Sequence, residues 1–562
     1  MNTVLFWFRN DLRLHDQPAL QAALAGGARH LLPVAFLLAD DEPTHWGWER
    51  VGPLRRAWQR SALRDLDRQL TALGCPLLLC DGDPAMVLPA LAQAVDATAL
   101  YCEEIAAPEE RQQVAALRAA GLTVHTTWQS SLLDPRHLPW TPDALPASYT
   151  PFRQAIERAL QIGAPATATA PAPSAGQLAP APAGKKRRQR SAALKAPAPA
   201  TALLAPSFML PAPLQPPAAL LPWPPGAAEA IASLPGYRTE LLSATDMPTD
   251  GSAPAATTSC ATAPNTLPEM PGADRTIRST ASEAPGADRA AWSTAPQTPV
   301  GDASTAADDA LLSDPRSSLP AGPAGLQGGE TAALAHLQQY LQRRLPDSYK
   351  RTRNQLHGVD FSSKWSPWLA NGALSPRRIM AEVRAYEAQH GANEGTYWLW
   401  FELLWRDYFR LLHLQYGAAL YRARGLSTQP LAAPACTADQ RTAQLARWRH
   451  GDTGQPLVDA AMRELLHTGY LSNRLRQAVA SYLLNELDGD WRAGAAWFES
   501  RLIDYDVYSN QGNWLYIAGR GTDPRGGRHF NLDKQTVEHD ADGAYRALWA
   551  RDQPACTLVE KI

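Results

Sequence analysis

The first 130 residues alternate short apolar runs with longer segments of helical periodicity. Continuous apolar runs of this length predict buried strands, and they occupy residues 4–8, 31–38, 76–80, 99–102 and 122–128. The helical patterns over 53–74 and 108–121 each end in a glycine, a residue that readily closes a helix. Strands that alternate with helices predict a doubly wound parallel sheet, and we expect this α/β domain to span residues 1–160.

Helical periodicity resumes near residue 331 and continues to the C-terminus, which predicts an all-α domain over 331–562. Between the two domains, residues 161–330 are rich in Ala, Pro, Ser, Thr and Gly. Such a segment buries too little apolar surface to offset the entropy lost on ordering, so we expect a long disordered insertion. The fold class is therefore an N-terminal α/β domain and a C-terminal helical domain joined by that insertion.

Three short stretches of the insertion differ from the rest. Residues 202–210 and 227–234 are apolar enough to form transient helices or to dock on the folded domains. The basic run KKRRQR at 185–190 has two interpretations, a solvated charge run or a contact with nucleic acid.

Composition narrows the class of protein further. The formal net charge is −2, which excludes a uniformly basic chain but leaves room for a local basic groove. The six cysteines form no Cys-x-x-Cys pair, so no metal site is predicted and a reducing compartment fits best. The first residues carry no signal-peptide pattern, and no apolar run is long enough for a membrane span. We expect a cytoplasmic protein, and a monomer.

Polar residues concentrate on one helix face and in one loop of the helical domain. Asn473, Arg476 and Gln477 fall at i, i+3 and i+4 and therefore share a face. The loop that follows downstream contains Asp504-x-Asp506, with Asn510 and Trp514 at four-residue steps behind it. One interpretation is a solvated face and a polar loop. The other is a pocket for a large ring system rich in hydrogen-bonding groups.

Two further segments carry candidate chemistry. Ser362, Ser363 and Ser366 precede a Pro-Trp-Leu sequence, a pattern that opens a helix and that also suits a phosphate. Glu402 and Arg406 lie four residues apart in the helix predicted over 396–417, usually a surface ion pair. Because this helix is too apolar for a surface position, and because buried charges need partners, a pocket is favoured.

These segments together resemble the photolyase/cryptochrome family, over about 1–160 and 335–550. The carrying motifs are WFRNDLRLHDQPAL near the N-terminus, TGYLSNRLRQAVASYL, and DWRAGAAWFESRLIDYDVYSNQGNW. The motif LIDYDVYSN-GNW is most similar to that of the DASH-type cryptochromes. In this sequence the long insertion departs from the family pattern.

The resemblance implies an FAD cofactor, present as FADH⁻ in the active state. The matching positions imply that the cofactor-binding residues are Tyr349, Ser362, Ser363, Ser366, Arg406, Asn473, Arg476, Asp504, Asp506 and Asn510. Within that set, Arg476 is expected to pair with Asp504. Asn510 is expected near the flavin N5, where it would tune protonation.

The resemblance also implies an antenna chromophore in the α/β domain, in many members a folate such as 5,10-methenyltetrahydrofolate. Its carboxylate ligand would be Glu104, although an ungapped comparison places Ile105 at that position. A solvated loop glutamate is the alternative.

Catalysis in the family is a light-driven electron transfer to a pyrimidine dimer in DNA, and the electron returns after the ring splits. The matching catalytic residues are Glu402, Trp405 and Asn510. The electron relay to the flavin would use Trp514 and Trp491, with Trp448 as outer carrier because the customary outer position holds Ala438.

DNA contacts are implied for Trp405, Arg474, Gln477, Tyr516 and Arg525, with Arg528 a further candidate in the same tail. Tyr516 and Gln477 stand where duplex-active photolyases often carry Trp and Met, which is typical of the DASH type. Losing an indole weakens base stacking, which is worth about 1–3 kcal/mol per base, and single strands require the least unpairing.

The sequence therefore predicts a DASH-type cryptochrome, an FAD-dependent lyase for cyclobutane pyrimidine dimers in single-stranded DNA. One alternative is a blue-light photoreceptor that signals through flavin photoreduction without repair. A further alternative is a conventional photolyase active on duplex DNA.

Overall fold

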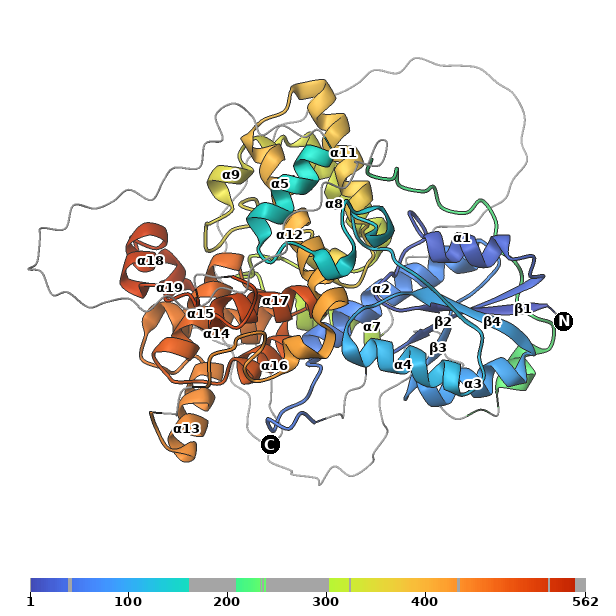
Figure 1. Ribbon diagram of the computed structural model, residues 1–562, viewed down its shortest axis with the longest axis horizontal. Coiled ribbons are helices and arrows are strands. Elements are labelled where there is room, and N and C mark those ends of the chain that lie inside the picture. Colours follow the sequence, from blue (N-terminus) through green and yellow to red (C-terminus); the bar gives the residue numbers. More distant parts are fainter. Residues whose placement is uncertain are drawn as a thin grey trace, which may run out of the picture. The chain divides into compact units, whose positions relative to one another are not determined.

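The structure is a computed structural model, and it describes residues 2–38, 43–160, 209–232, 234, 237–238, 303–322, 325–431, 435–523 and 526–550. The described residues up to 238 and from 307 onward belong to one unit. In that unit an α/β part precedes a helical part in sequence (Figure 1). No helix in the described portion combines the length and the apolar character that crossing a bilayer requires.

The α/β part is built on a parallel sheet with β1 at its centre. Its strands are β1 (Thr3–Phe8), β2 (His30–Phe36), β3 (Leu78–Cys80), β4 (Ala97–Glu103), β5 (Val124–Thr127) and β6 (Tyr237–Arg238), in the order β5-β4-β1-β2-β3-β6. The first five strands are parallel, and only β6 runs antiparallel, beside β3. The five strands predicted from apolar runs are thus confirmed. Strands β2 and β3 are added on one side of β1, and β4 and β5 on the other, so the order of strand addition reverses between β1 and β4. In such sheets ligands bind beside the carboxyl ends of the strands at this point.

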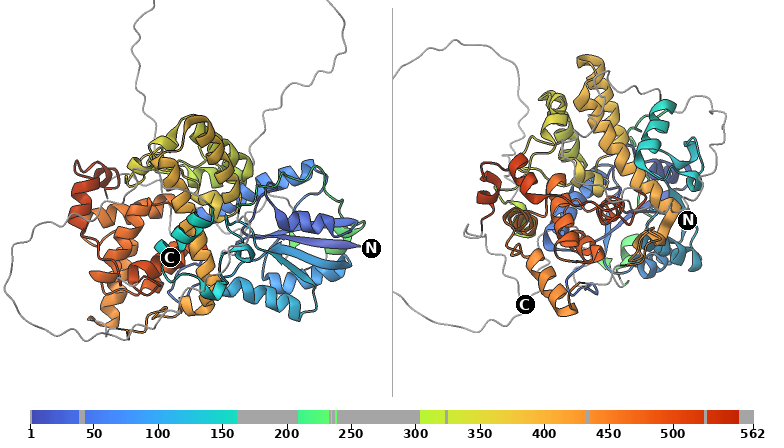
Figure 2. Two further views of the ribbon diagram at one scale, coloured as in Figure 1. Left: turned by 45° about the horizontal axis from the view of Figure 1, so that its top comes forward. Right: turned by 60° about the vertical axis from the view of Figure 1, so that its left-hand side comes forward.

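Helices cover both faces of the sheet (Figures 1 and 2). They are α1 (Pro18–Ala25), α2 (Pro53–Ala72), α3 (Pro84–Ala94) and α4 (Pro108–Ala119). Phe6 and Phe8 of β1 pack with α1 and α2, whereas Leu5 and Trp7 pack with α3 and α4. The sequence pattern identified α2 and α4 but not α1 or α3. Helix α3 contains an internal proline, which usually disfavours a helix interior.

Parts of the insertion are ordered and pack on the α/β part. Helix α6 (Ala227–Ile231) joins the apolar cluster on the α3 side of the sheet, and Trp223 donates its indole N–H to the carbonyl of Pro76 at 2.8 Å. In α7 (Ala303–Leu312), Asp308 is ion-paired with Arg60 and Arg64. Residues 227–234 were expected either to form transient helices or to dock on the folded domains, and α6 is docked. The basic run at 185–190 and residues 202–208 lie outside the described residues.

The helical part surrounds one long buried helix, α12 (Glu394–Tyr416). The other helices are α5 (Tyr149–Ala159), α8 (Glu330–Gln342), α9 (Tyr349–Thr352), α10 (Ser366–Ala370), α11 (Pro376–His390), α13 (Ala438–Arg449), α14 (Pro456–Thr468), α15 (Asn473–Asn485), α16 (Trp491–Arg501), α17 (Val507–Ala518), α18 (Leu532–His539) and α19 (Ala544–Leu548). Most of α12 is buried, which explains why its sequence is apolar on nearly all sides. Helix α5 shares the apolar cluster of α12, so residues up to 159 contribute to the helical core.

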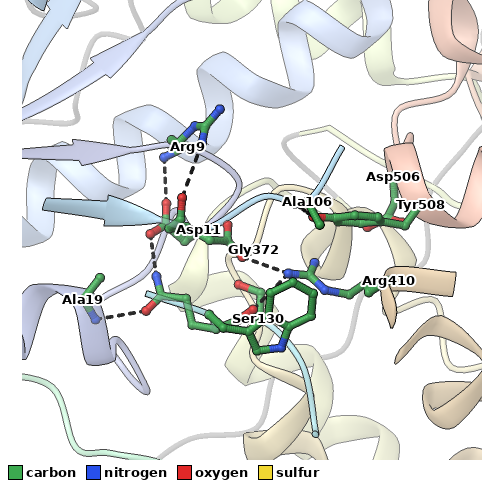
Figure 3. A network of polar contacts seen from close by, with 12 residues as sticks. Arg9, Asp11, Ala19, Ala106, Ser130, Gly372, Arg410, Asp506 and Tyr508 are labelled. Atoms are coloured by element: carbon green, nitrogen blue, oxygen red, sulfur yellow. Dashed lines mark hydrogen bonds and ion pairs between the residues drawn. The ribbon is translucent and has the colours of Figure 1, made fainter. Parts of the chain in front are cut away.

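A buried polar network joins the loop after β1 to the helical part (Figure 3). Asp11 accepts hydrogen bonds from the backbone N–H of Arg9 and from the side chain of Gln129, both at 2.7 Å. Arg13 donates to the carbonyl of Gly372 at 2.7 Å, and Arg410 of α12 pairs with Glu103 at 3.2 Å. Burial raises the pKa of Glu103 to about 7, with Arg410 opposing the rise. The N-terminal motif thus contacts the helical part through Arg13 and the Gly372 carbonyl, and α12 is tied to the sheet through Arg410 and Glu103.

Candidate functional site

A cavity of about 460 Å³ lies among α9, α10, α12, α15 and α17. Its volume falls in the range of ligand pockets, roughly 300–1,000 Å³. A side chamber of about 80 Å³ shares Asn473, Arg476 and Asp504 with it and extends toward Trp514. The predicted cofactor residues line these two spaces: Tyr349, Ser362, Ser363, Ser366, Arg406, Asn473, Arg476 and Asp504 in the main cavity, and Asp506 and Asn510 in the chamber.

The serine-rich segment, which the sequence suggested for a phosphate, forms one end of the cavity wall. Ser366 is the first residue of α10, and the N-cap position belongs to Trp365, which makes no side-chain cap. The serines therefore do not cap the helix as the pattern indicated, and three of them face the cavity instead. Lys364 in their midst adopts a left-handed backbone conformation, with φ of 56°.

Lys364 is a buried amine without a partner. Its ammonium lies 3.5 Å from the centre of the Phe361 ring and 4.9 Å from that of Tyr470, and it makes no hydrogen bond among the described residues. Burial lowers the pKa of Lys364 to about 7, although Glu464 opposes the shift. Buried polar groups normally have partners. An unpaired amine beside three serine hydroxyls therefore fits the diphosphate of a flavin nucleotide.

Helix α12 supplies the opposite wall. It begins with a capping box between Asn393 and Thr396, and Glu402, Trp405, Arg406 and Phe409 occur along one face that lines the cavity. Their spacing of i, i+3, i+4 and i+7 accounts for the shared face.

Glu402 is paired with a residue from outside its own helix. Its partner is Arg353, whose guanidinium lies 4.1 Å above the Trp398 ring. Burial raises the pKa of Glu402, and Arg353 opposes that rise. The i,i+4 pair between Glu402 and Arg406 is therefore not formed. A carboxylate held at the cavity wall by one cation can accept further hydrogen bonds from a ligand.

Arg406 connects the cavity to the buried network. It donates to Asp506 at 3.3 Å, to the Leu369 carbonyl at 2.9 Å and to the Ser130 carbonyl. Burial alone would raise the pKa of Asp506, but Arg406 and Arg410 outweigh it and lower that pKa. Asp506 also caps α17 by accepting from the backbone N–H of Ser509 at 2.7 Å. An ionised, fixed carboxylate thus lies at the side chamber.

The expected ion pair between Arg476 and Asp504 is confirmed. Both Asp504 oxygens accept from one guanidinium nitrogen, at 2.9 and 2.7 Å, and Arg476 also donates to the Leu471 carbonyl at 2.9 Å. The side chain of Asp504 is 1% exposed and that of Arg476 is 22% exposed. Because the ion pair with Asp504 fixes the guanidinium, Arg476 presents its positive charge to the cavity in a fixed position.

The predicted relay tryptophans occupy three different positions. Trp514 lines the side chamber, and Trp491 is buried in the wall of a second cleft, where its indole donates to the Ala423 carbonyl at 2.9 Å. The Trp448 ring lies 6.4 Å from that of Trp514 and is fully buried. An outer carrier must exchange electrons with solvent, so the position of Trp448 contradicts the outer role expected for it.

Two aromatic side chains stand at the border of the cavity, where DNA contacts were expected. Trp405 stacks on Tyr149 with ring centres 3.7 Å apart, and its edge faces Tyr516 at 6.2 Å. The Arg528 guanidinium lies 4.6 Å above Tyr516 and is ion-paired with Asp523.

The other expected DNA contacts differ in position. Gln477 lines the cavity. Arg474 does not line it and instead donates to Asn354 at 3.0 Å. Arg525 lies outside the described residues.

A second cleft of about 580 Å³ lies beside the carboxyl end of β1. Asn10, Glu109 and Glu110 of the α/β part line it, as do Trp491 and Asn510 of the helical part. Glu104 is not among the lining residues, so the structure does not support it as the ligand of an antenna in this cleft. The two lining glutamates come five and six residues after Glu104, a larger difference than the single position that separates Glu104 from Ile105.

Sequence reasoning missed Arg353, Lys364 and Tyr149. Arg353 follows Tyr349, and Lys364 lies between Ser363 and Ser366. A charged side chain in such a position, close to apolar residues, is a signal that could have identified both. Tyr149 contacts Trp405 across more than two hundred residues of sequence, and no local pattern indicates that stack.

Comparisons with known proteins agree with this architecture. Residues 4–174 match the family described as DNA photolyase, and residues 398–553 match the FAD binding domain of DNA photolyase. The chain is 36% identical over 555 residues to Cryptochrome DASH of Gloeobacter violaceus, covering 97% of this chain and 85% of that protein. It is 34% identical over 553 residues to Cryptochrome DASH of Synechocystis sp., covering 97% and 87%.

Solved structures give a corresponding result. The Synechocystis sp. cryptochrome superposes with a TM-score of 0.69 at 33% identity, covering 98% of this chain and 88% of that one. A bacterial class III photolyase from Agrobacterium tumefaciens shares the fold, with a TM-score of 0.63 at 23% identity and coverage of 98% and 86%.

Proposed function

Because the chain belongs to the photolyase/cryptochrome family and to its DASH-type cryptochromes, we propose that it splits cyclobutane pyrimidine dimers with FAD and blue light, preferentially in single-stranded DNA. One observation carries this proposal. The polar wall suited to a flavin nucleotide and the Trp405–Tyr516 border belong to the same cavity. A dimer that enters between those rings would therefore meet the cofactor directly.

Reduced FAD, when bound, would supply the light-driven electron that opens the dimer and would take it back afterwards. The protein then has to bind and orient the cofactor and the dimer, and to exclude water from the site. Ser362, Ser363, Ser366 and Lys364 would hold the diphosphate, with Tyr349 beside them. Asn473, Arg476, Asp504 and Asp506 would fix the ring system, and Arg406 would hold Asp506 in place.

Two residues would act at the dimer itself, and a third beside the cofactor. Glu402, fixed by Arg353, would accept the imide N–H of a pyrimidine, a charge-assisted hydrogen bond that is stronger than a neutral one. Trp405, supported from behind by Tyr149, would stack on a base. The side-chain amide of Asn510 donates to the Ala495 carbonyl at 3.0 Å. The amide oxygen of Asn510 can then accept a hydrogen bond from a group near the cofactor.

The preference for single strands rests on Tyr516. Its ring is smaller than an indole, so it stacks less strongly on a base than tryptophan would. A weaker clamp compensates less for extruding a dimer from a duplex, which requires a few kcal/mol. Gln477 adds a polar side chain to the same wall. Arg474, which donates to Asn354 at 3.0 Å, would also meet a backbone phosphate.

Trp514 and Trp491 would carry electrons to the flavin from outside. Trp514 lines the side chamber and would be the inner carrier, and Trp491 lines the second cleft. That cleft is also where we place a folate antenna, because it opens at the strand ends of β1 and borders Asn510.

A repair assay on the purified, reduced protein tests the proposal. Blue light should restore intact thymines in a single-stranded oligonucleotide with one dimer, and a dark sample should not. Photoreducible FAD without any repair would instead identify a blue-light photoreceptor. Glu402→Ala should lower repair more than FAD content, and equal repair at full FAD content would contradict the role given to Glu402.

A further inference from the structure

A third pocket, of about 330 Å³, lies behind the aromatic border of the main cavity. The two spaces share only Trp405, Phe409 and Tyr516, so one layer of aromatic side chains separates them. Of the residues proposed to act on the cofactor or the dimer, Trp405 and Tyr516 line this pocket from its border, whereas Glu402, Arg476 and Asp504 do not. It is therefore a separate site, adjacent to the place where the proposed function puts the dimer.

The lining of this pocket suits a flat, heteroaromatic ring. Tyr408, Leu412 and Leu426 add apolar surface to the three shared aromatic residues. Polar groups occur at one side, where the Thr522 hydroxyl lies 3.1 Å from the Tyr408 hydroxyl and Asp523 supplies a carboxylate. Ligand pockets combine an apolar lining with a few such polar groups. Aromatic faces bind any nucleobase by stacking, and the polar groups can bond ring nitrogens or exocyclic groups.

A cation lies beside the pocket as well. Arg528 stacks 4.6 Å above Tyr516 and pairs with Asp523, both of which line the pocket. Arginines add cation–π contributions to single-strand binding, and a planar guanidinium also suits the geometry of a backbone phosphate.

We propose that this pocket binds the base of the nucleotide next to the dimer, on one side of it, in a single-stranded substrate. The inference rests on the proposed function, since the dimer defines the register of the strand. A base that is paired in a duplex cannot enter the pocket without unpairing. The site therefore adds to the single-strand preference that the weaker clamp at Tyr516 gives.

The test measures dark binding by fluorescence anisotropy, using the full-length FAD-containing protein. Three single strands are compared, each with one central dimer: an unmodified strand, one with an abasic site directly 5′ of the dimer, and one with it directly 3′. One of the abasic strands should bind roughly 5- to 150-fold more weakly, the range that stacking of a single base is worth. The other should bind as the unmodified strand does.

Leu426→Phe, which fills the pocket, should weaken binding of the unmodified strand to the level seen for the sensitive abasic strand. Binding of the sensitive abasic strand itself should not change. Leu431→Phe is the matched control, because Leu431 is 54% exposed and does not line the pocket. Equal binding of all three strands, or an equal loss for both abasic strands, would overturn the proposal even if Leu426→Phe fails to fold. Repair is measured separately under light, so a protein that binds with the expected asymmetry but repairs nothing would contradict only the proposed function.

Discussion

Replacing Asp504 with asparagine should disrupt the proposed flavin site more than any comparable surface change. The carboxylate is 1% exposed, and it neutralises Arg476, which is 22% exposed. Removing one partner of a buried ion pair typically costs about 3–5 kcal/mol, because a charge is left uncompensated. Partial solvation of Arg476 reduces this cost, so we expect the free energy of unfolding to fall by about 2–4 kcal/mol.

The matched control is Asp360→Asn, which breaks the exposed pair between Asp360 and Arg343. Those side chains are 46% and 57% exposed, so the loss should stay below about 1 kcal/mol. Urea unfolding followed by circular dichroism gives both stabilities, and the flavin absorbance of the purified variants gives their FAD content. Asp504→Asn should also lose FAD, because Arg476 is no longer fixed at the cavity. Unchanged stability and full FAD content in Asp504→Asn would refute the role assigned to this pair.

Three further changes test individual residues. Trp491→Phe should abolish flavin photoreduction, followed by absorbance under blue light, yet spare repair by chemically reduced protein; unchanged photoreduction would remove Trp491 from the relay. Wild-type FAD affinity, measured by fluorescence titration, should weaken as pH rises above about 7, because Lys364 is then neutral before binding and must take up a proton to pair with the diphosphate. Lys364→Met should bind FAD more weakly at pH 6 and lose that pH dependence, and a pH profile like that of the wild type would contradict the assignment. Glu402→Gln should lower the repair yield roughly 10- to 100-fold at full FAD content, the equivalent of one hydrogen bond to a charged group, and an unchanged yield would contradict it.

Apolar runs and helical periods predicted most of the fold because burial imposes them locally. The five parallel strands and the buried α12 follow from that pattern. Helices α1 and α3 were missed, since α3 contains a proline that normally disfavours a helix. The docking of α7 through Asp308 was also missed, because a single buried acid in a polar segment has no periodic signature.

The candidate site was predicted well where neighbours in sequence share a helix face, and less well where contacts are distant. The face of Glu402, Trp405 and Arg406 follows from helical spacing alone. The partner of Glu402 could not be obtained from spacing, because Arg353 comes from another segment. Burial of Trp448, which excludes it as outer carrier, depends on the packing of α13 against the rest and has no local signal.

The most direct test of the central claim compares repair of one dimer in a single strand and in the matching duplex, under the same blue-light dose and with the same reduced protein. We expect efficient repair of the single strand and little repair of the duplex, because Tyr516 stacks too weakly to offset extrusion of the dimer. Equal repair of both substrates would contradict the single-strand preference and indicate a conventional photolyase. Repair of neither substrate, by protein that holds photoreducible FAD, would contradict the lyase itself.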